Sequence, residues 1–335
     1  MRNAFNMSFD LNLYSQYRTE LMGWAIIMVV ISHIHGFGVS MYEPLRQLTS
    51  VGASGVELFL FVSGFGLWKS LRTATNGTFS LNAAVLIPWY KRRYYRILVP
   101  YVIFAIPMYG VLTIMDHQDF MEFVRRVTFL SFWTKGWGLW YVAMLIPLYF
   151  ISPFLIKLLS GKEKVVWFVV FLLATELFAY FVFGGQRDVY YSRFIVQRLP
   201  SFFIGIFMAE SICDGKKISL WIVLFVPLLA YFMLRGLNHT IGTRFFYLWL
   251  LPLPFSTITS WLVTRYSWLR TTLNFMGVLS LELYCTHMFL PKLLIRVFNI
   301  SPSIYMYLVG VGACIIVSAG INMASNILIS KLSDK

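Results

Sequence analysis

Long, uninterrupted apolar runs recur along this chain and constrain its fold more than any other feature. A helix needs about 20 mainly apolar residues to cross roughly 30 Å of hydrocarbon. The runs do not alternate between apolar and polar residues, which argues against a transmembrane β-barrel. We therefore expect about ten membrane-spanning helices, at residues 21–37, 55–71, 97–115, 138–158, 165–183, 194–213, 218–234, 245–263, 273–290 and 303–329.

The scarcity of charge supports the same class of protein. Asp, Glu, Lys and Arg make up 13% of the 335 residues, and 59% are hydrophobic, whereas soluble domains average about 25% charged residues. This composition excludes a disordered chain, a disulfide-stapled secreted domain and an ordinary cytosolic enzyme. Since no repeat or long linker interrupts the chain, we expect one domain over residues 1–335, an all-α polytopic transmembrane helix bundle.

The net charge of +14 is explained by membrane topology better than by a nucleic-acid partner. Lysines and arginines accumulate in the cytoplasmic loops of membrane proteins. An N-terminus placed inside puts most of the basic residues on that side, including Arg2, Lys335 and the dense cluster at residues 91–96. We therefore expect both termini in the cytoplasm, contact with the lipid bilayer and no nucleic acid.

Four ionisable residues lie inside the predicted spans, where such groups are costly and indicate function. His33 lies about 18 Å along the first span, and Glu57 starts the second span at a similar depth. Glu282 and His287 belong to the ninth span. Their similar depth predicts a cluster in which Glu57 orients His33 as a general base. A histidine that merely bridges two helices is the alternative, and His35 is expected at the interface.

A basic group marks the opposite, cytoplasmic mouth of the third span. Arg93 and Arg96 are three residues apart and share a helix face, so we expect Arg96 to point into the bundle. Two guanidinium groups there suit a phosphorylated ligand from the cytosol. A topogenic signal with an aromatic belt explains these residues equally well, and it is the preferred interpretation for Lys91 and Arg92.

Other candidates have two interpretations each. Trp140 and Tyr141 suit interfacial anchoring, with sugar stacking as the alternative. Arg198, at the start of a span, is expected to pair with a carboxylate or to extend to water. Cys285 could act as a nucleophile, but packing of a small side chain is preferred. Three cysteines without paired spacing predict neither a disulfide framework nor a metal site.

Five segments follow one another in a recognisable order. They are R-T-E-L-M-G-W-A-I-I-M-V-V-I-S-H at residues 18–33, G-V-E-L-F-L-F-V-S-G-F at 55–65, Y-K-R-R-Y-Y-R-I-L-V-P-Y at 90–101, R-L-P-S-F-F-I-G at 198–205 and L-S-L-E-L-Y-C-T-H at 279–287. This series resembles the acyltransferase-3 family, integral membrane acyltransferases that modify surface polysaccharides and related envelope molecules. The resemblance covers most of the chain and implies about ten spans in the bacterial plasma (inner) membrane.

The resemblance implies an acyl-CoA-dependent O-acyltransferase. The donor would be cytosolic acyl-coenzyme A, usually acetyl-CoA, and the acceptor a hydroxyl of an envelope, exported or lipid-linked glycan. No metal is implied, and a homo-oligomer is left open. The essential histidine of the family maps onto His33, its acidic position onto Glu57, and its ninth-span histidine onto His287. The arginines of the family map onto Arg93 and Arg96.

The chain departs from the family at Met22, where a basic residue usually stands eleven positions before the histidine. Arg18, one turn earlier on the same face, is the expected substitute and would join Arg93 and Arg96 on the coenzyme A phosphates.

His33 would act as general base or acyl carrier, while His287 or Glu282 would position the acceptor or stabilise the oxyanion. The candidate acceptor-binding residues are Trp140, Tyr141, Arg198, Tyr284 and Ser63. A transporter or exporter of a glycan or lipid-linked precursor is the alternative function, although no repeat is evident and the polar groups lie off-centre. A non-catalytic sensor or scaffold of the same fold is the third.

Overall fold

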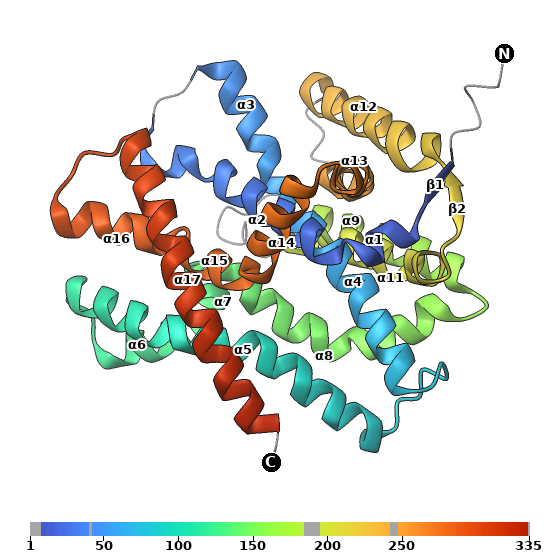
Figure 1. Ribbon diagram of the computed structural model, residues 1–335, viewed down its shortest axis with the longest axis horizontal. Coiled ribbons are helices and arrows are strands. Elements are labelled where there is room, and N and C mark those ends of the chain that lie inside the picture. The colour runs from blue at the N-terminus through green and yellow to red at the C-terminus, as the bar shows by residue number, and fades with distance from the viewer. Residues whose placement is uncertain (1–7, 40–41, 184–194, 242–246, 334–335) are drawn as a thin grey trace. The chain divides into compact units, whose positions relative to one another are not determined.

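The computed structural model describes residues 8–39, 42–183, 195–241 and 247–333, and these residues are almost entirely helical (Figure 1). The chain forms two compact units, each built from separate segments of sequence. Unit 1 comprises Met1–Val29, Gly52–Phe79 and Pro153–Val278, and unit 2 comprises Val30–Val51, Ser80–Ser152 and Leu279–Lys335. Four residues used in the topology prediction lie outside the described residues: Arg2, Phe194, Phe245 and Lys335.

Unit 1 begins with a short strand that pairs with a strand far along the chain. Strand β1 (Ser8–Asp10) runs antiparallel to β2 (Lys217–Ser219), with Phe9 opposite Ile218. The remaining elements are α1 (Asn12–Gln16), most of α2 (Arg18–Ser32), η3 (Gly52–Ser54), α4 (Gly55–Ala74), the last part of α8 (Trp140–Ser160), α9 (Lys164–Phe183), α11 (Leu199–Cys213), η4 (Trp221–Phe225), α12 (Val226–Ile241), η5 (Leu248–Leu250), α13 (Pro252–Arg265) and α14 (Ser267–Val278).

Glycines bring the helices of unit 1 into backbone contact. A Cβ atom at Gly205 of α11 would lie 2.2 Å from the carbonyl oxygen of Phe61 in α4, and Gly64 of α4 approaches α11 equally closely. Gly23 of α2 and Gly277 of α14 repeat this arrangement. Since larger side chains would force these backbones apart, small residues set the packing, as in other membrane helix pairs.

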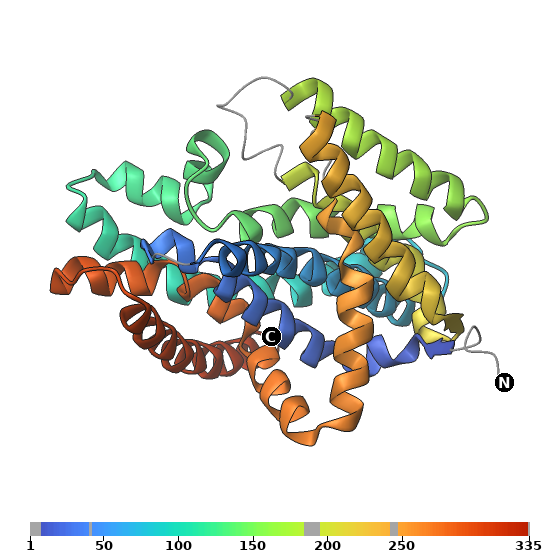
Figure 2. The ribbon, with the colours of Figure 1, turned by 90° about the horizontal axis from the view of Figure 1, so that it is seen from above.

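Unit 2 contains the ends of helices that carry most of the predicted site residues. After the last turn of α2 come η2 (Ile34–Phe37) and α3 (Glu43–Val51). Its remaining elements are α5 (Ala83–Met115), α6 (Phe120–Val127), α7 (Leu130–Lys135), the first part of α8 (Trp140–Ser160), α15 (Ser280–Thr286), α16 (Phe289–Phe298) and α17 (Ile304–Ser333). Helices α16 and α17 lie side by side in both ribbon views (Figures 1 and 2).

By length and composition, four helices among the described residues could cross a membrane: Glu43–Ala74, Ala83–Met115, Trp140–Ser160 and Ile304–Leu332. The pair Ser267–Val278 and Ser280–Phe298, bent by 62°, would make a fifth. Other apolar runs form shorter helices, and the 15 residues of α2 or α11 reach only about 22 Å. The chain is therefore a helical, multi-pass membrane protein with four to five candidate spans, while the expected ten spans and cytoplasmic termini stay predictions.

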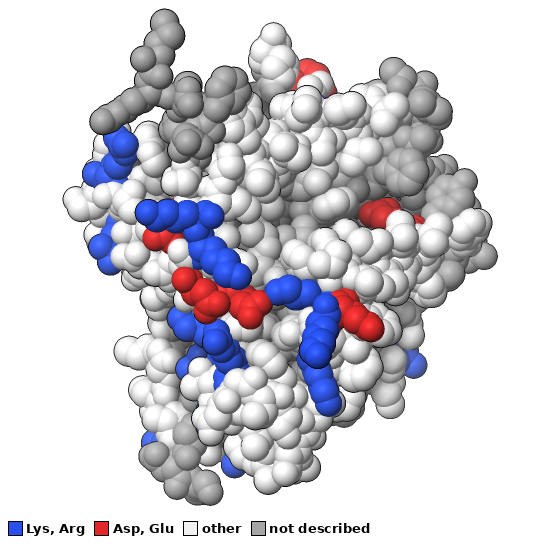
Figure 3. Space-filling view, turned by 90° about the vertical axis from the view of Figure 1, so that its right-hand side faces the viewer, with Lys and Arg blue, Asp and Glu red and all other residues white. Residues whose placement is uncertain are grey.

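On one face of the molecule, charged side chains are concentrated rather than scattered (Figure 3). On the face drawn in Figure 3, Lys and Arg lie beside Asp and Glu in a band, and most of the remaining surface there is uncharged. Ion pairs of unit 1 include Arg72–Asp214 at 3.4 Å and Lys164–Glu210 at 2.7 Å, both near helix ends. Large uncharged surfaces with paired charges at helix ends suit a protein in contact with lipid.

Candidate functional site

Two of the predicted catalytic residues meet in unit 2. The ring centroids of His33 and His287 lie 4.9 Å apart, with the ring planes at 69°. His287 is 2% exposed, and His33 is half-buried. His33 directly follows α2 and His287 directly follows α15, so both imidazoles lie at the carbonyl ends of helices. The negative end of the helix dipole there favours positive charge on a neighbouring side chain.

The hydrogen bonds of His287 define its tautomer. Its Nδ1 lies 2.8 Å from the carbonyl oxygen of Tyr284 and 3.1 Å from that of Leu283. Carbonyl oxygens only accept hydrogen bonds, so Nδ1 carries the proton and Nε2 holds a lone pair. This Nε2 atom is buried and has no hydrogen-bond partner among the described residues. It can therefore accept a hydrogen bond from a substrate hydroxyl.

The backbone next to His33 is held by a residue distant in sequence. The buried Tyr307 hydroxyl, on α17, donates to the carbonyl oxygen of Val30 at 2.5 Å. The His33 amide donates to the same oxygen at 3.1 Å, and the His33 side chain lies 3.3 Å from the Ser32 hydroxyl through Nδ1. Tyr307 thus fixes the helix end from which His33 projects.

Polar contacts also join α15 to α17. The Asn322 amide donates to Glu282 Oε1 at 2.9 Å, and the hydroxyls of Thr286 and Ser318 are 3.1 Å apart. Glu282 therefore binds α17, and its predicted role in oxyanion or acceptor binding stays a prediction. These contacts hold α15 in place and position His287 at its end.

Three predicted acceptor-binding residues extend the histidine cluster. The Tyr141 amide donates to the Tyr284 hydroxyl at 3.1 Å, and their rings lie 5.1 Å apart. The Tyr284 ring is 5.6 Å from that of His287, and Trp140 packs edge-on against Tyr141 at 6.0 Å. Segments about 140 residues apart in sequence are thus brought to one site.

Glu57 forms a buried ion pair in unit 1. Its Oε1 atom lies 2.5 Å from Arg198 Nη1, and the two side chains are 0% and 2% exposed. Arg198 also donates to the carbonyl oxygen of Ala53 at 3.3 Å. Of the two alternatives for Arg198, pairing with a carboxylate is therefore confirmed. Glu57 and His33 belong to different units, so the orientation of His33 by Glu57 stays a prediction, as does the role of half-buried Ser63.

The basic residues predicted to bind coenzyme A differ in exposure. The half-buried Arg93 guanidinium lies 5.8 Å from the Trp89 ring centroid, one turn earlier on α5. Arg96 is exposed, so the prediction that it points into the bundle is wrong. Position along a helix does not determine which face the neighbouring helices cover. Arg18 is exposed and lies over Gly66 of α4, where an added Cβ would approach its Nε within 2.9 Å.

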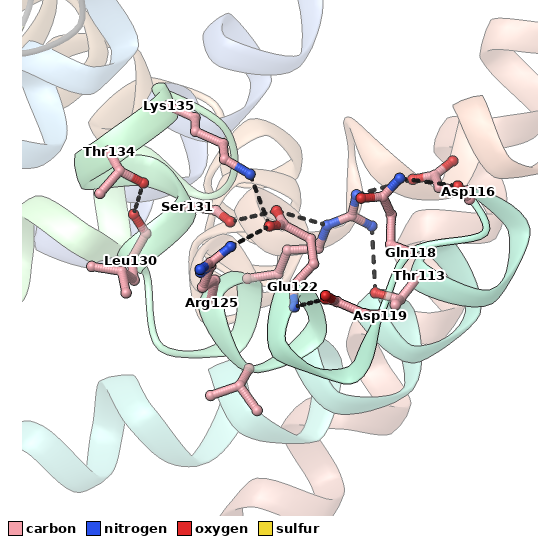
Figure 4. A network of polar contacts seen from close by, with 12 residues as sticks. Thr113, Asp116, Gln118, Asp119, Glu122, Arg125, Leu130, Ser131, Thr134 and Lys135 are labelled. Carbon is pink, nitrogen blue, oxygen red and sulfur yellow. Dashed lines mark hydrogen bonds and ion pairs between the residues drawn. The ribbon is translucent and has the colours of Figure 1, made fainter.

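A network of charges around α6 was not expected from the sequence (Figure 4). Glu122 accepts hydrogen bonds from Lys135 at 2.8 Å and Ser131 at 2.9 Å, and it is paired with Arg125 and Arg126. The hydrogen bond from Lys135, helped by Ser131, holds the Glu122 pKa below its usual range. The i,i+4 spacing of Glu122 and Arg126 was the available signal in the sequence.

The same network continues to the ends of α5 and α16. Arg126 Nη2 donates to Asp116 at 3.1 Å, and Arg296 of α16 donates to the other Asp116 oxygen at 2.5 Å. These two arginines, Arg296 foremost, lower the pKa of Asp116. The Arg126 guanidinium also lies 4.5 Å from the centroid of the Trp137 ring. Trp137 was also not singled out from the sequence. The two glycines that flank it were the available signal of a turn there.

Among the described residues, neither a metal centre nor a cysteine nucleophile has structural support. In the part of the chain that the structure describes, no group of three or more His, Cys, Asp or Glu side chains could hold a metal ion. Cys285 is fully buried, which fits the packing interpretation. The site is accordingly built from two imidazoles with aromatic and hydroxyl neighbours.

A multi-pass helical protein with two neighbouring imidazoles, one buried and one half-buried, defines a membrane protein equipped for proton transfer or nucleophilic catalysis. The family model for acyltransferase 3, described as an acyltransferase domain, matches residues 21–323. The chain therefore belongs to the acyltransferase-3 family and is a membrane acyltransferase, which confirms the resemblance of the five sequence segments. No curated protein and no solved structure matches the chain.

Proposed function

We propose that this acyltransferase moves an acyl group from cytosolic acyl-coenzyme A to a hydroxyl of an envelope or exported glycan. The preferred acyl group is acetyl. The observation that carries the proposal is the His33–His287 pair, in which His287 Nε2 is buried with an available lone pair. Acyl transfer to an alcohol requires a group that removes the hydroxyl proton as the oxygen attacks the thioester. An imidazole in a water-poor site suits this task.

His287 Nε2 accepts a hydrogen bond from a neighbouring hydroxyl of the acceptor and so positions it. His33 takes the proton of the reacting hydroxyl while the acceptor oxygen forms a bond to the thioester carbonyl carbon. The tetrahedral intermediate then collapses, the carbon–sulfur bond breaks, and the departing thiolate receives the proton from His33. In the alternative course, His33 itself attacks the thioester and carries the acyl group before the alcohol displaces it. Positive charge on His33 is favoured by the end of α2, where Tyr307 fixes the backbone.

Helix α5 supports a path within unit 2 along which acyl-coenzyme A could extend from the arginines toward the histidines. It carries Arg93 and Arg96 in one half and Tyr109 thirteen residues beyond Arg96, a distance of about 20 Å along the helix. Tyr109 packs against Phe289, two residues after His287, with ring centroids 5.6 Å apart. The arginines would hold the coenzyme A phosphates, with Arg18 of unit 1 as a third cation, and the pantetheine arm would extend toward the histidines.

The topology completes the proposal. About ten spans with both termini in the cytoplasm would place the arginines on the inner side and the histidines in the outer half of the bacterial plasma membrane. The family match covers segments of both compact units, which supports one functional domain over residues 1–335. The proposal is compatible with a single copy of the chain or with a homo-oligomer.

The direct test compares His33→Ala with His35→Ala in purified, detergent-solubilised protein. His35 is a matched control because it lies two residues away and its Nε2 is bonded to Thr49 at 2.8 Å. We expect His33→Ala to lower acetyl-CoA turnover in the presence of deacylated glycan by at least about a hundredfold, and His35→Ala to change it less than about threefold. Wild-type turnover in folded His33→Ala protein would contradict the assignment.

A further inference from the structure

Trp137, in the same unit as the imidazole pair, is exposed and yet firmly held. It lies in the loop between α7 and α8, and 41% of its surface is accessible. Gly136 and Gly138 flank it with φ angles of +69° and +125°, which side-chain-bearing residues rarely adopt. The Trp137 amide donates to the carbonyl oxygen of Ser131 at 3.3 Å. The loop backbone thus presents this ring in one orientation.

The ring contacts connect Trp137 to the histidines. Phe289 packs edge-on against it at 6.1 Å, and Tyr109 lies 6.2 Å away. Phe289 begins α16, two residues after His287. A ligand stacked on Trp137 would therefore lie beside the site at which we place acyl transfer.

The buried Arg126 guanidinium packs against the Trp137 ring. The Arg126 guanidinium over Trp137 is itself 9% exposed and is fixed by Asp116, Glu122 and Thr113. A tryptophan that only anchors a protein at the lipid headgroups needs no such support. A preorganised, exposed aromatic ring is instead typical of binding surfaces, where ordering the side chain in advance lowers the entropic cost.

We propose that Trp137 is a stacking residue for the sugar ring of the acceptor. The apolar C–H face of a sugar packs against an aromatic ring, and its hydroxyls bind nearby charged groups. Arg125 and Lys135, with side chains 43% and 55% exposed, provide such donors at the edge of the network. This inference rests on the proposed function and adds the residue that recognises a glycan rather than a simple lipid alcohol.

The test measures KM for acceptor and donor separately in Trp137→Ala, Trp137→Phe and Trp133→Ala. Trp133 is a matched control because it lies on α7, is 49% exposed and packs against Phe132 rather than on a guanidinium. The acceptor probe is deacylated polysaccharide from a host strain that lacks this gene, and the donor is acetyl-CoA.

We expect Trp137→Ala to raise the acceptor KM about tenfold or more, with the donor KM changed less than about twofold; tenfold corresponds to about 1.4 kcal/mol. Trp137→Phe should fall between this variant and wild type, and Trp133→Ala should leave both constants unchanged. An unchanged acceptor KM in Trp137→Ala, or an equal shift in Trp133→Ala, would overturn the stacking role alone. Failure of the wild-type protein to acylate any glycan would overturn the proposed function instead.

Discussion

In each compact unit, two ionisable residues that the sequence singled out lie together, and the two pairs are built differently. In unit 1, Glu57 and Arg198 have opposite charges and lie 2.5 Å apart. In unit 2, His33 and His287 are chemically alike, and their rings lie 4.9 Å apart. Glu57 and Arg198 neutralise each other, whereas the histidine pair keeps a lone pair on His287 Nε2 without a partner among the described residues.

Because the two pairs differ in charge, we expect substitutions in the first to affect stability and substitutions in the second to affect catalysis. Removal of one member of a buried ion pair leaves an uncompensated charge, so the effect is on folding. Removal of an imidazole leaves no charge behind, and the effect is on proton transfer. Close backbone contacts at Gly64 and Gly205 join α4 to α11, the helices next to the ion pair, while hydroxyl and amide contacts join α15, next to His287, to α17. We therefore expect substitutions in the two places to have opposite signatures.

The largest effect is expected from His287→Asn. The Asn amide can still donate to the carbonyl oxygens that Nδ1 now contacts but offers nothing in place of Nε2. Turnover should drop about 10²–10⁴-fold, with the unfolding temperature close to that of wild type. Steady-state kinetics with thermal unfolding in detergent checks this, and near-normal turnover in the folded variant would remove Nε2 from the mechanism.

Arg198→Met should act in the opposite way. It leaves the Glu57 carboxylate buried without its partner, and we expect a loss of about 3–5 kcal/mol in stability. The double variant Glu57→Met with Arg198→Met should recover most of that loss, because no unpaired charge remains. A single variant as stable as wild type would contradict the structural role.

The double variant also sharpens the comparison. If it folds and retains turnover, the ion pair serves structure alone. If it folds but is inactive, at least one of the two predicted roles applies: Glu57 in the chemistry or Arg198 in acceptor binding.

The smallest effect concerns pH. Glu122 and Asp116 have pKa values held below their ordinary 4.5 and 3.8 by hydrogen bonds from Lys135 and Arg296. The folded state therefore binds fewer protons than the unfolded state, so their contribution is complete above these values and is lost as pH falls below them. Thermal unfolding between pH 6 and 3 should show this loss, and Glu122→Gln should flatten it. An equally steep loss in Glu122→Gln would rule out this carboxylate as the source.

Much of the site was predictable from the sequence because its members are chemically conspicuous. A histidine or carboxylate within an apolar run is costly in lipid, which marked His33, His287 and Glu282 without any structure. The aromatic neighbours Tyr141 and Tyr284 were also found. Trp137 was missed, because a tryptophan near a span end resembles an interfacial anchor until its support by Arg126 is seen.

The sequence alone determined the class of protein and the family, because apolar runs and motif order are local properties of the chain. Tertiary structure decided which side chains meet. Arg198 and Glu57 pair across 141 positions, and Tyr307 reaches Val30 across 277. Such pairings depend on the rotation of each helix and on close backbone approach at glycines, which hydrophobic patterns do not encode. The same dependence leaves Arg96 exposed and Glu57 bound to an arginine.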